Sequence, residues 1–394
     1  EAASIEGLGL LRPDQLQFLW LPMSHSFGKV LLSAQLACGF ATAIDGRVDK
    51  IVENCATVKP TFMGAAPRIF EKAYARIAAT VAAETGVKRQ LMDWALDVGK
   101  QVMELRAQGQ APGALLGIQH AVADKLVLSK IRERFGGRVR FFISGSAALN
   151  PEIARWFGSV GLIILEGYGL TETSAATCVN RPSLGGYNYG TVGWAIPTTD
   201  VKLAADGEIL VKGPGVMRGY RNRPDATAEV FDEDGYFRTG DIGEIDANGF
   251  VKITDRKKDL FKTSGGKYIA PSLIEAAFKA QCPYASQILV FGDGRNYATA
   301  LITLDPDAIT AWGAANRMAG KSYAEISQTP EVRELLQGYI DTLNQGLNRW
   351  ETIKRFTVLD RDLTIDEGEL TPSLKLKRKH VAEKFKANLE ALYD

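Results

Sequence analysis

Residues 139–173 read VRFFISGSAALNPEIARWFGSVGLIILEGYGLTET and contain the pattern that decides the fold. The near-continuous apolar runs VRFFIS (139–144) and GLIIL (161–165) are typical of strands in a parallel sheet that is covered on both faces. Between these runs, the segment from Pro151 to Phe157 is expected to form a helix. A strand, a helix and a strand in this order predict a βαβ unit, whose crossover is nearly always right-handed.

The segments before this unit continue the alternation of strands and helices. QFLWLPMS (17–24) predicts another buried strand. VLLSAQLACGFATAI (30–44) predicts a buried helix followed by a strand, because the run is too short and too interrupted to span a bilayer. Between Pro67 and Phe135 apolar residues recur at helical spacing, with a second helix expected over 121–135.

From about Thr191 the pattern changes to short strands separated by glycine-rich turns. The strands are expected around Val201, at 207–212 and at 249–254.

A basic, polar loop, DRKKDLFKTSGGK (255–267), then precedes a helix that begins near Pro271 and the paired strands QILVFG and YATALITL. We place a domain boundary near 255–259 and divide the chain into residues 1–257 and 258–394.

Composition limits the classes of function. The chain has 394 residues, enough for a large domain and a smaller one, and its formal charge of +1 produces no overall field that would favour nucleic acid. Its four cysteines are scattered, which argues against a disulfide framework or a zinc site. We interpret them as reduced thiols and expect a cytoplasmic protein that does not bind nucleic acid.

The end of the second strand carries chemically useful side chains, Tyr168, Thr171 and Glu172. A tyrosine ring can stack on a base, a threonine can bind a phosphate oxygen, and a carboxylate can bind Mg²⁺, which prefers oxygen ligands. The glycines on both sides of Tyr168 would let a ligand approach the backbone closely. Taken alone, YGLTE is equally well explained as a strand-to-loop turn with a capping threonine.

Three downstream clusters also have two interpretations each. Asp241, in GYFRTGD, could accept two ribose hydroxyls or belong to a hairpin turn with a solvated salt bridge. The basic loop with Gly265 and Gly266 suits an anion, or is a flexible surface hinge. Lys375, in LTPSLKLKRKH, follows a turn that would offer it to a cleft, although such a charge run is normally a solvated tail.

The order and spacing of these clusters are more informative than any one of them. YGxTE, GEILVKGPGVMRGY, RTGD, DRxKDxxKTSGGKYIAP and a proline-preceded lysine near the end occur in one chain. In this order they resemble the adenylate-forming superfamily, over roughly Trp20 to Lys379. PRIFEK, KRQLMDWAL and the long stretch 125–152 are similar to long-chain fatty acyl-CoA synthetases.

The resemblance implies an architecture and a reaction. It implies an α/β fold in which a large, here truncated, domain of parallel βα sheets with a small β-barrel-like part precedes a small, mobile α+β domain, with a hinge near Lys258. In such enzymes a fatty carboxylate attacks the α-phosphate of ATP, with Mg²⁺ present, to give an acyl-adenylate and pyrophosphate. The thiol of CoA then attacks the acyl carbonyl and releases AMP.

The resemblance also implies roles for individual residues. Lys375 would bridge carboxylate and phosphate, Thr171 would bind the α-phosphate, and Glu172 would bind Mg²⁺. Asp241 and Arg256 would hold the ribose. The remaining implied nucleotide contacts are Gly145, Ser146, Ala147, Glu166, Gly167, Tyr168, Gly169, Gly265 and Gly266.

Several positions qualify the resemblance. His25, in LPMSHSFG, matches a family position near the acyl and CoA tunnel, although a lone histidine is more often structural than catalytic. The chain departs from the family pattern at Ser146, commonly glycine, and at 373–374, where many relatives have threonine-glycine. Nothing before Trp20 resembles the family's Ser/Thr/Gly-rich phosphate loop. We therefore expect a C-terminal portion of a longer enzyme, which binds AMP weakly and adenylates poorly by itself.

Two alternatives stay open. A related enzyme would transfer the adenylate to an acyl-carrier protein, but that subgroup tends to carry an insertion that we do not find, which favours CoA. A non-catalytic fragment would bind only nucleotide or acyl chain. The basic C-terminal tract also leaves open a peripheral contact with anionic lipid.

Overall fold

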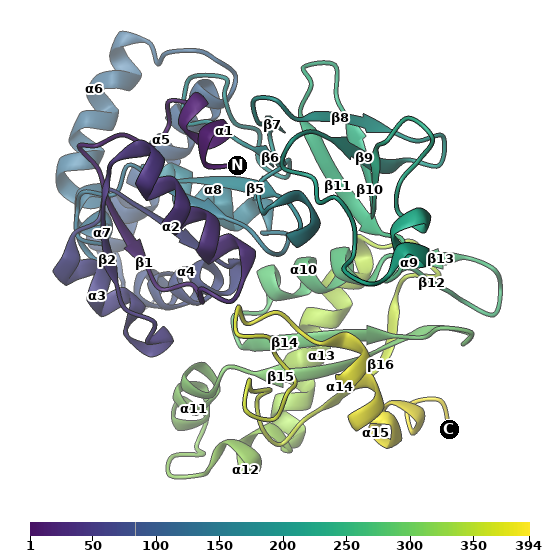
Figure 1. The fold of residues 1–394 in the computed structure, drawn as a ribbon. Helices are drawn as coiled ribbons and strands as arrows, with labels where there is room; N and C mark the ends of the chain where they lie inside the picture. Colours follow the sequence, from purple (N-terminus) through teal and green to yellow (C-terminus); the bar gives the residue numbers. More distant parts are fainter. Residues whose placement is uncertain (83) are drawn as a thin grey trace. The chain divides into compact units, whose positions relative to one another are not determined.

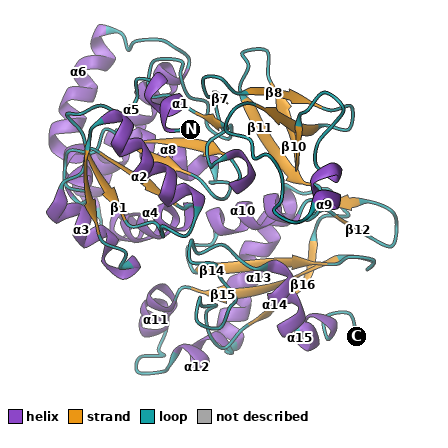
Figure 2. Cartoon of the chain, viewed as in Figure 1, coloured by secondary structure: helices purple, strands orange, loops and turns teal. Residues whose placement is uncertain are grey.

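The computed structural model describes residues 1–82 and 84–394. The chain separates into two compact units, Glu1–Thr254 and Asp255–Asp394 (Figure 1). This separation falls within strand β11 (Val251–Arg256), close to the division that the sequence predicts between residues 257 and 258. Each unit contains both helices and strands (Figure 2), in agreement with the α/β prediction.

The first unit alternates helices and strands along most of its length. Its α-helices are α1 (Ala2–Gly7), α2 (Ser26–Cys38), α3 (Ile51–Val58), α4 (Pro67–Ala82), α5 (Gly86–Ala107), α6 (Ala114–Ala123), α7 (Ser129–Glu133), α8 (Pro151–Ser159) and α9 (Pro224–Glu229). Shorter helical segments are η1 (Val48–Lys50), η2 (Asp124–Leu128) and η3 (Thr171–Thr173). Its strands are β1 (Leu16–Leu19), β2 (Ala41–Ile44), β3 (Phe62–Ala65), β4 (Phe141–Ser144), β5 (Ile163–Tyr168), β6 (Cys178–Val179), β7 (Trp194–Ala195), β8 (Asp200–Leu203), β9 (Glu208–Lys212) and β10 (Phe237–Ile245), with β11 at its end.

Among the described residues, seven strands form one sheet in the order β2-β1-β3-β4-β5-β6-β7. The strands from β2 to β5 in this order run parallel, whereas β6 and β7 are added antiparallel at one edge. Helix α8 connects β4 to β5, and these two strands pair directly in parallel register. The βαβ unit predicted from residues 139–173 is confirmed.

Helices cover both faces of this sheet. Adjacent residues of a strand point to opposite faces, so individual residues show which helix lies on which face. Gly64 in β3 faces α2, because a Cβ atom placed there would lie 2.6 Å from Leu31 Cδ1. Phe142 in β4 lies on the other face, where it contacts Phe70 of α4 and Phe157 of α8 at ring centroid separations of 5.3 and 6.4 Å. Edge-to-face aromatic packing therefore builds the core on that side.

Two predicted elements have different bounds in the structure. The helix expected over 121–135 begins earlier, at Ala114, and continues to Glu133 through a π-helical segment (η2) that joins α6 to α7. The strand expected to end at Leu165 continues to Tyr168, so YGLTE starts inside β5. Within residues 1–82 and 84–394, no helix has the length and apolar character of a membrane span.

A four-stranded sheet, in the order β11-β10-β9-β8, forms the β-rich region that the sequence predicts after Thr191. The RTGD motif lies inside β10 and not in a hairpin turn. The register of β10 against β9 shifts between Arg238 and Ile242, and Gly240 adopts a φ of 73° there. Such an irregularity changes the direction of nearby side chains, and Asp241 lies within this stretch.

The second unit is built on a sheet in the order β14-β15-β16 and a separate hairpin. Its strands are β12 (Phe261–Lys262), β13 (Tyr268–Ile269), β14 (Ala285–Phe291), β15 (Ala298–Leu304) and β16 (Ile353–Val358), and its helices are α10 (Pro271–Gln281), α11 (Pro306–Ala315), α12 (Tyr323–Ser327), α13 (Pro330–Gln345), α14 (Arg378–Lys384) and α15 (Lys386–Glu390). The antiparallel pairing of β14 with β15 confirms the prediction for QILVFG and YATALITL. Strand β16, parallel to β15, was not predicted.

Alternate residues of β14 enter two separate cores. Ile288 and Val290 belong to a large cluster that includes Phe278 of α10. Leu289 faces a smaller cluster that includes Leu370 and Val381. The smaller cluster therefore holds the C-terminal segment, which contains Lys375, against the sheet.

Candidate active site

The carboxyl ends of β4 and β5 lie side by side in the first unit. Ser144, the last residue of β4, is in register with Glu166 of β5. Residues 145–147 follow β4 directly, and Gly169 follows β5, so the two predicted backbone segments lie at the same edge of the sheet. Ligands of open α/β sheets bind outside the carboxyl ends of the strands. This edge is therefore the candidate nucleotide site.

Ser146 has the backbone of a glycine. Its φ is 72°, in the left-handed region that is costly for most residues with a Cβ atom. This explains why glycine is common at the position in the family that the sequence resembles. The hydroxyls of Ser144 and Ser146 are buried, and neither has a hydrogen-bond partner among the described residues.

Tyr168 and Asp241 are distant in the sequence but meet in the structure. The phenol of Tyr168 donates a hydrogen bond of 2.6 Å to Oδ2 of Asp241, which is only 6% exposed. Burial, and then the nearby Asp241 carboxylate, raises the pKa of Tyr168 well above its usual value, so the phenol remains protonated. The ring predicted for adenine and the carboxylate predicted for ribose therefore lie side by side.

The loop after β5 holds Thr171 and Glu172 in a short 3₁₀ segment. The amide of Leu170 donates to Thr173 Oγ1 at 2.9 Å, which closes this segment. Glu172 Oε1 accepts a hydrogen bond of 2.9 Å from the phenol of Tyr220, a residue that sequence reasoning did not single out. Thr171 is exposed.

Glu166 connects β5 to the turn after β4. Its Oε2 accepts a hydrogen bond of 2.6 Å from the amide of Leu149, and its backbone carbonyl accepts one of 3.1 Å from the amide of Asn180. Burial of the carboxyl group raises the pKa of Glu166 to about 7, and the Leu149 amide opposes this only partly. The predicted nucleotide contact therefore also has a structural role.

The pKa of Glu166 predicts a dependence of stability on pH. Because the folded-state pKa is raised from 4.5 to about 7, the stabilisation is complete below about pH 4.5 and is lost as pH rises through about 7. Between pH 5 and pH 8 the free energy of unfolding should fall by up to roughly 3 kcal/mol relative to the Glu166→Gln variant, which keeps an acceptor for Leu149. Urea unfolding of both proteins across this range measures the difference, and parallel pH profiles would contradict the prediction.

His25 caps a helix in the structure. Its Nδ1 accepts a hydrogen bond of 3.2 Å from the amide of Phe27, at the start of α2. A Cβ atom on Gly145 would lie 3.3 Å from Phe27 Cε1, so the Phe27 ring packs on the turn after β4. Sequence reasoning did not find Phe27, because its contact depends on the position of α2 over the sheet. A direct role of His25 in acyl or CoA binding stays a prediction.

In the second unit, Lys375 lies on a tight loop between two bridged residues, Leu370 and Leu376. The Lys375 carbonyl accepts a hydrogen bond of 2.8 Å from the Thr371 amide, and its own amide donates to Thr371 Oγ1 at 3.0 Å. Lys375 is exposed. Leu374, at a position where many relatives have glycine, has a φ of 65° and packs against the smaller core.

The other predicted residues of the second unit lie near its start. Arg256 ends β11, and its carbonyl accepts hydrogen bonds from the amides of Asp259 and Leu260 at 2.9 and 3.0 Å. Gly265 and Gly266 lie in the turn of the β12–β13 hairpin, and no heavy atom beyond their chain neighbours lies within 3.8 Å of a Cβ placed at either. The basic loop is therefore more regular than expected, and its turn is open to a ligand.

Comparisons with known proteins match both units. Residues 2–221 match a family described as AMP-binding enzyme, and residues 258–394 match the AMP-binding enzyme C-terminal domain. The chain is 36% identical over 386 residues to the long-chain-fatty-acid–CoA ligase FadD15 of Mycobacterium bovis, covering 98% of this chain but 63% of that protein. It is 41% identical over 393 residues to the putative fatty-acid–CoA ligase fadD11 of Mycobacterium tuberculosis, covering 98% of this chain and 68% of that protein.

A solved structure has the same fold. It is the A domain of carboxylic acid reductase from Segniliparus rugosus, in complex with AMP and a co-purified carboxylic acid. The TM-score is 0.68 and the sequence identity 25%, over 96% of this chain and 54% of that one. The same fold is thus known with AMP and a carboxylic acid bound.

Proposed function

Because the chain belongs to the family of AMP-binding enzymes, we propose that it forms part of an ATP-dependent long-chain fatty acid–CoA ligase. The chain spans 63% of the first curated relative that it matches, so the proposal concerns the natural full-length protein. The substrates are a long-chain fatty or similar carboxylic acid, ATP and CoA. The products are acyl-CoA, AMP and pyrophosphate.

One observation supports this proposal above the others, the pairing of Tyr168 with Asp241 at the carboxyl edge of the parallel sheet. The pair combines a flat ring with a buried carboxylate, which suits an adenine and its ribose. The loop with Thr171 and Glu172 directly follows β5. The buried, unpartnered hydroxyl of Ser146 adds an unsatisfied polar atom at the same edge, as expected where a polar ligand binds.

The chemistry explains why these residue types are required. A fatty carboxylate is a poor acyl donor, because an oxide would have to leave. Attack of its oxygen on the α-phosphorus releases pyrophosphate and forms a mixed anhydride with AMP. The CoA thiolate then forms a thioester bond at the acyl carbon, and AMP leaves. Thr171 would donate to the α-phosphate, and Lys375 would stabilise the negative charge shared by phosphate and carboxylate.

The donor set at Glu172 suits Mg²⁺. One of its oxygens accepts a hydrogen bond from the Tyr220 phenol. This hydrogen bond orients the carboxylate in the loop beside the sheet edge. Mg²⁺ is usually held by one or two protein carboxylates together with substrate phosphates and water. When bound, the ion would neutralise phosphate charge and so assist the departure of pyrophosphate.

We further propose that the second unit supplies different residues to the two half-reactions. Lys375 would serve adenylation, and the turn with Gly265 and Gly266 would serve thioester formation, with Lys258 at the hinge. Movement of this kind excludes water, which would otherwise hydrolyse the adenylate.

The proposal is tested by pyrophosphate release from the natural full-length protein with fatty acids of graded length, with and without CoA. We expect release that depends on a long-chain acid and acyl-CoA as the final product. Release without any acyl-CoA, together with acylation of an added carrier protein, would replace CoA by a carrier protein as the acceptor. AMP binding without pyrophosphate release for any acid would favour the non-catalytic alternative.

A further inference from the structure

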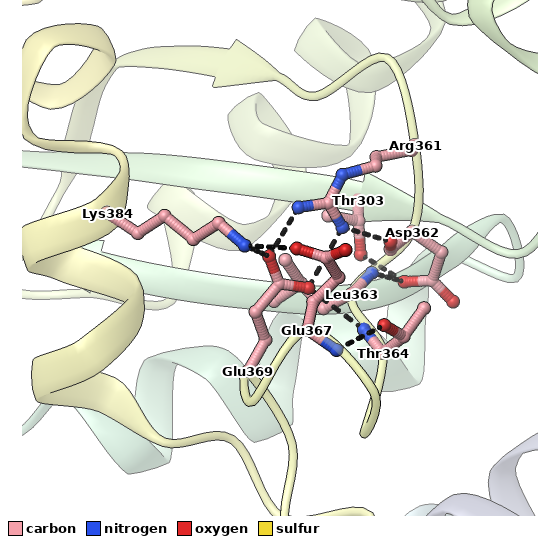
Figure 3. A network of polar contacts seen from close by, with 8 residues as sticks. All are labelled: Thr303, Arg361, Asp362, Leu363, Thr364, Glu367, Glu369 and Lys384. Carbon is pink, nitrogen blue, oxygen red and sulfur yellow. Dashed lines mark hydrogen bonds and ion pairs between the residues drawn. The ribbon is translucent and has the colours of Figure 1, made fainter.

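The second unit contains a carboxylate that is fully buried between two cations. The Glu369 side chain is 0% exposed, and it contacts both Arg361 and Lys384. Its Oε2 accepts a hydrogen bond of 2.9 Å from Arg361, whose other terminal nitrogen contacts Oε1 (Figure 3). Lys384 Nζ lies 3.0 Å from Oε1, and the amide of Thr364 donates to Oε2 at 3.0 Å. The carboxylate is therefore satisfied on both oxygens.

Glu369 is charged in this environment. Burial alone would raise the pKa of Glu369, but hydrogen bonds from Arg361, the Thr364 amide and Lys384 outweigh it and lower this pKa to about 2. A buried ion pair is weak evidence of a gain in stability, because well-packed apolar residues often replace one without loss. The role of the ion pairs of Glu369 is therefore inferred from the segment that they hold in position, and not from their contribution to stability.

Glu369 directly precedes the loop that carries Lys375. The Lys377 amide donates to the Glu369 carbonyl at 2.9 Å, and the bridge between Leu370 and Leu376 is the next pairing along the chain. The hydrogen bonds between Thr371 and Lys375 lie inside this bridge. The backbone of Glu369 thus closes the base of the Lys375 loop, while its side chain is held by Arg361 and Lys384.

The cluster is itself fixed to the sheet. Asp362 accepts hydrogen bonds of 2.6 Å from Ser286 in β14 and 2.7 Å from Thr303 in β15. The Arg361 guanidinium also donates to the Asp362 carbonyl at 3.0 Å. On the far side of the loop, Lys384 comes from α14 and binds Glu367 as well, at 2.7 Å. Figure 3 shows the contacts of Thr303, Arg361 and Lys384 with the segment before the loop.

We propose that Glu369, held by Arg361 and Lys384, is a positioning residue for Lys375 in the adenylation half-reaction. This inference rests on the proposed function, in which Lys375 contacts the reacting carboxylate and phosphate. Loss of the Glu369 charge leaves the Arg361 and Lys384 cations, whose side chains are 38% and 31% exposed, without the buried carboxylate that joins them. The segment before the loop then separates from α14, and the base of the loop widens. Small displacements of a reacting group are costly, since about 1 Å can lower a rate about 10²-fold.

The test is a double-mutant cycle in the natural full-length protein with Glu369→Gln, Lys375→Ala and both changes. Formation of acyl-AMP is measured from pyrophosphate release without CoA. Formation of acyl-CoA is measured from supplied acyl-AMP. We expect Glu369→Gln to lower the first rate by about 10- to 100-fold and the second by less than about threefold. In the Lys375→Ala background it should have no further effect on the first rate.

Hydrogen exchange gives a readout that does not depend on activity. Amides of Lys375 and Lys377 should lose protection in Glu369→Gln, while those of β14 and β15 keep theirs. Unchanged protection at both amides would overturn the inference. So would a double variant in which the losses of adenylation rate from Glu369→Gln and Lys375→Ala multiply. If Lys375→Ala leaves adenylation unchanged, the proposed role of Lys375 fails, and hydrogen exchange still decides whether Glu369 positions the loop.

Two further variants separate positioning from general stability. Arg361→Lys keeps the positive charge but loses the two-pronged contact with Glu369, so it should show a smaller selective loss of adenylation. It replaces Glu369→Gln as the test variant if that protein does not fold. Glu390→Gln removes the partner of Arg295 in a half-exposed ion pair of the same unit. It should change neither half-reaction nor the exchange at Lys375. A selective loss of adenylation in Glu390→Gln would contradict the assignment to Glu369.

Discussion

Replacement of Lys375 by alanine in the natural full-length protein is expected to lower the rate of acyl-AMP formation by about 10²- to 10³-fold. Lys375 is exposed, and the backbone of its loop is fixed by hydrogen bonds with Thr371. A positively charged group stabilises a transition state most where negative charge develops, which in the proposed reaction is between the carboxylate and the α-phosphate. Pyrophosphate release in single-turnover experiments measures this rate.

A neighbouring lysine provides the control. Lys379 is also exposed, four residues later in α14, and Lys379→Ala removes the same charge from the same basic tract. It should change adenylation by less than about twofold, because a surface charge outside the site acts only through a screened field. Equal losses in the two variants would show that the tract acts through its total charge and would remove the specific role from Lys375. Acyl-CoA formation from supplied acyl-AMP should be unchanged in both.

Gly169→Ala is expected to destabilise the first unit by about 3 kcal/mol or more and to abolish nucleotide binding. A Cβ atom at Gly169 would lie 1.5 Å from the carbonyl oxygen of Ala175 and 2.5 Å from its carbon. These are backbone atoms, so the conflict is relieved only if the loop with Thr171 and Glu172 moves. Denaturant unfolding and AMP titration measure the two effects.

Gly117→Ala is the matched control for this substitution. Gly117 lies within α6, and apart from its chain neighbours and the backbone of its own helix, no heavy atom lies within 4 Å of its Cβ position. Alanine there should be neutral or should stabilise the helix by up to about 1 kcal/mol. A Gly169→Ala protein with the stability and AMP affinity of Gly117→Ala would mean that the 169–175 contact is not required.

Sequence reasoning explained Gly169 differently from the structure. Glycines around Tyr168 were expected to admit a ligand to the backbone. The structure shows that the atoms nearest to Gly169 belong to the chain itself, because Ser174 and Ala175, with φ values of 59° and 93°, turn the loop back onto it. The return of a loop depends on dihedral angles that no local pattern of residues reveals.

Two departures from the family pattern occur at residues with positive φ angles. Ser146 and Leu374 stand where glycine is common, and their φ values are 72° and 65°. The backbone conformation is therefore retained without the residue that adopts it most easily. Packing of Leu374 against the smaller core accompanies its conformation, whereas nothing among the described residues bonds to the Ser146 hydroxyl.

The sequence by itself determined the alternation of strands and helices, the βαβ unit and the order of the motifs. Apolar periodicity reports which face of a segment is buried, and that is a local property of the chain. Tertiary structure alone decided that the Tyr168 phenol meets Asp241, that His25 caps α2, and that a buried Glu369 closes the base of the Lys375 loop. These contacts depend on sheet register and helix placement, which arise from packing among residues far apart in the chain and leave no periodic signal in it.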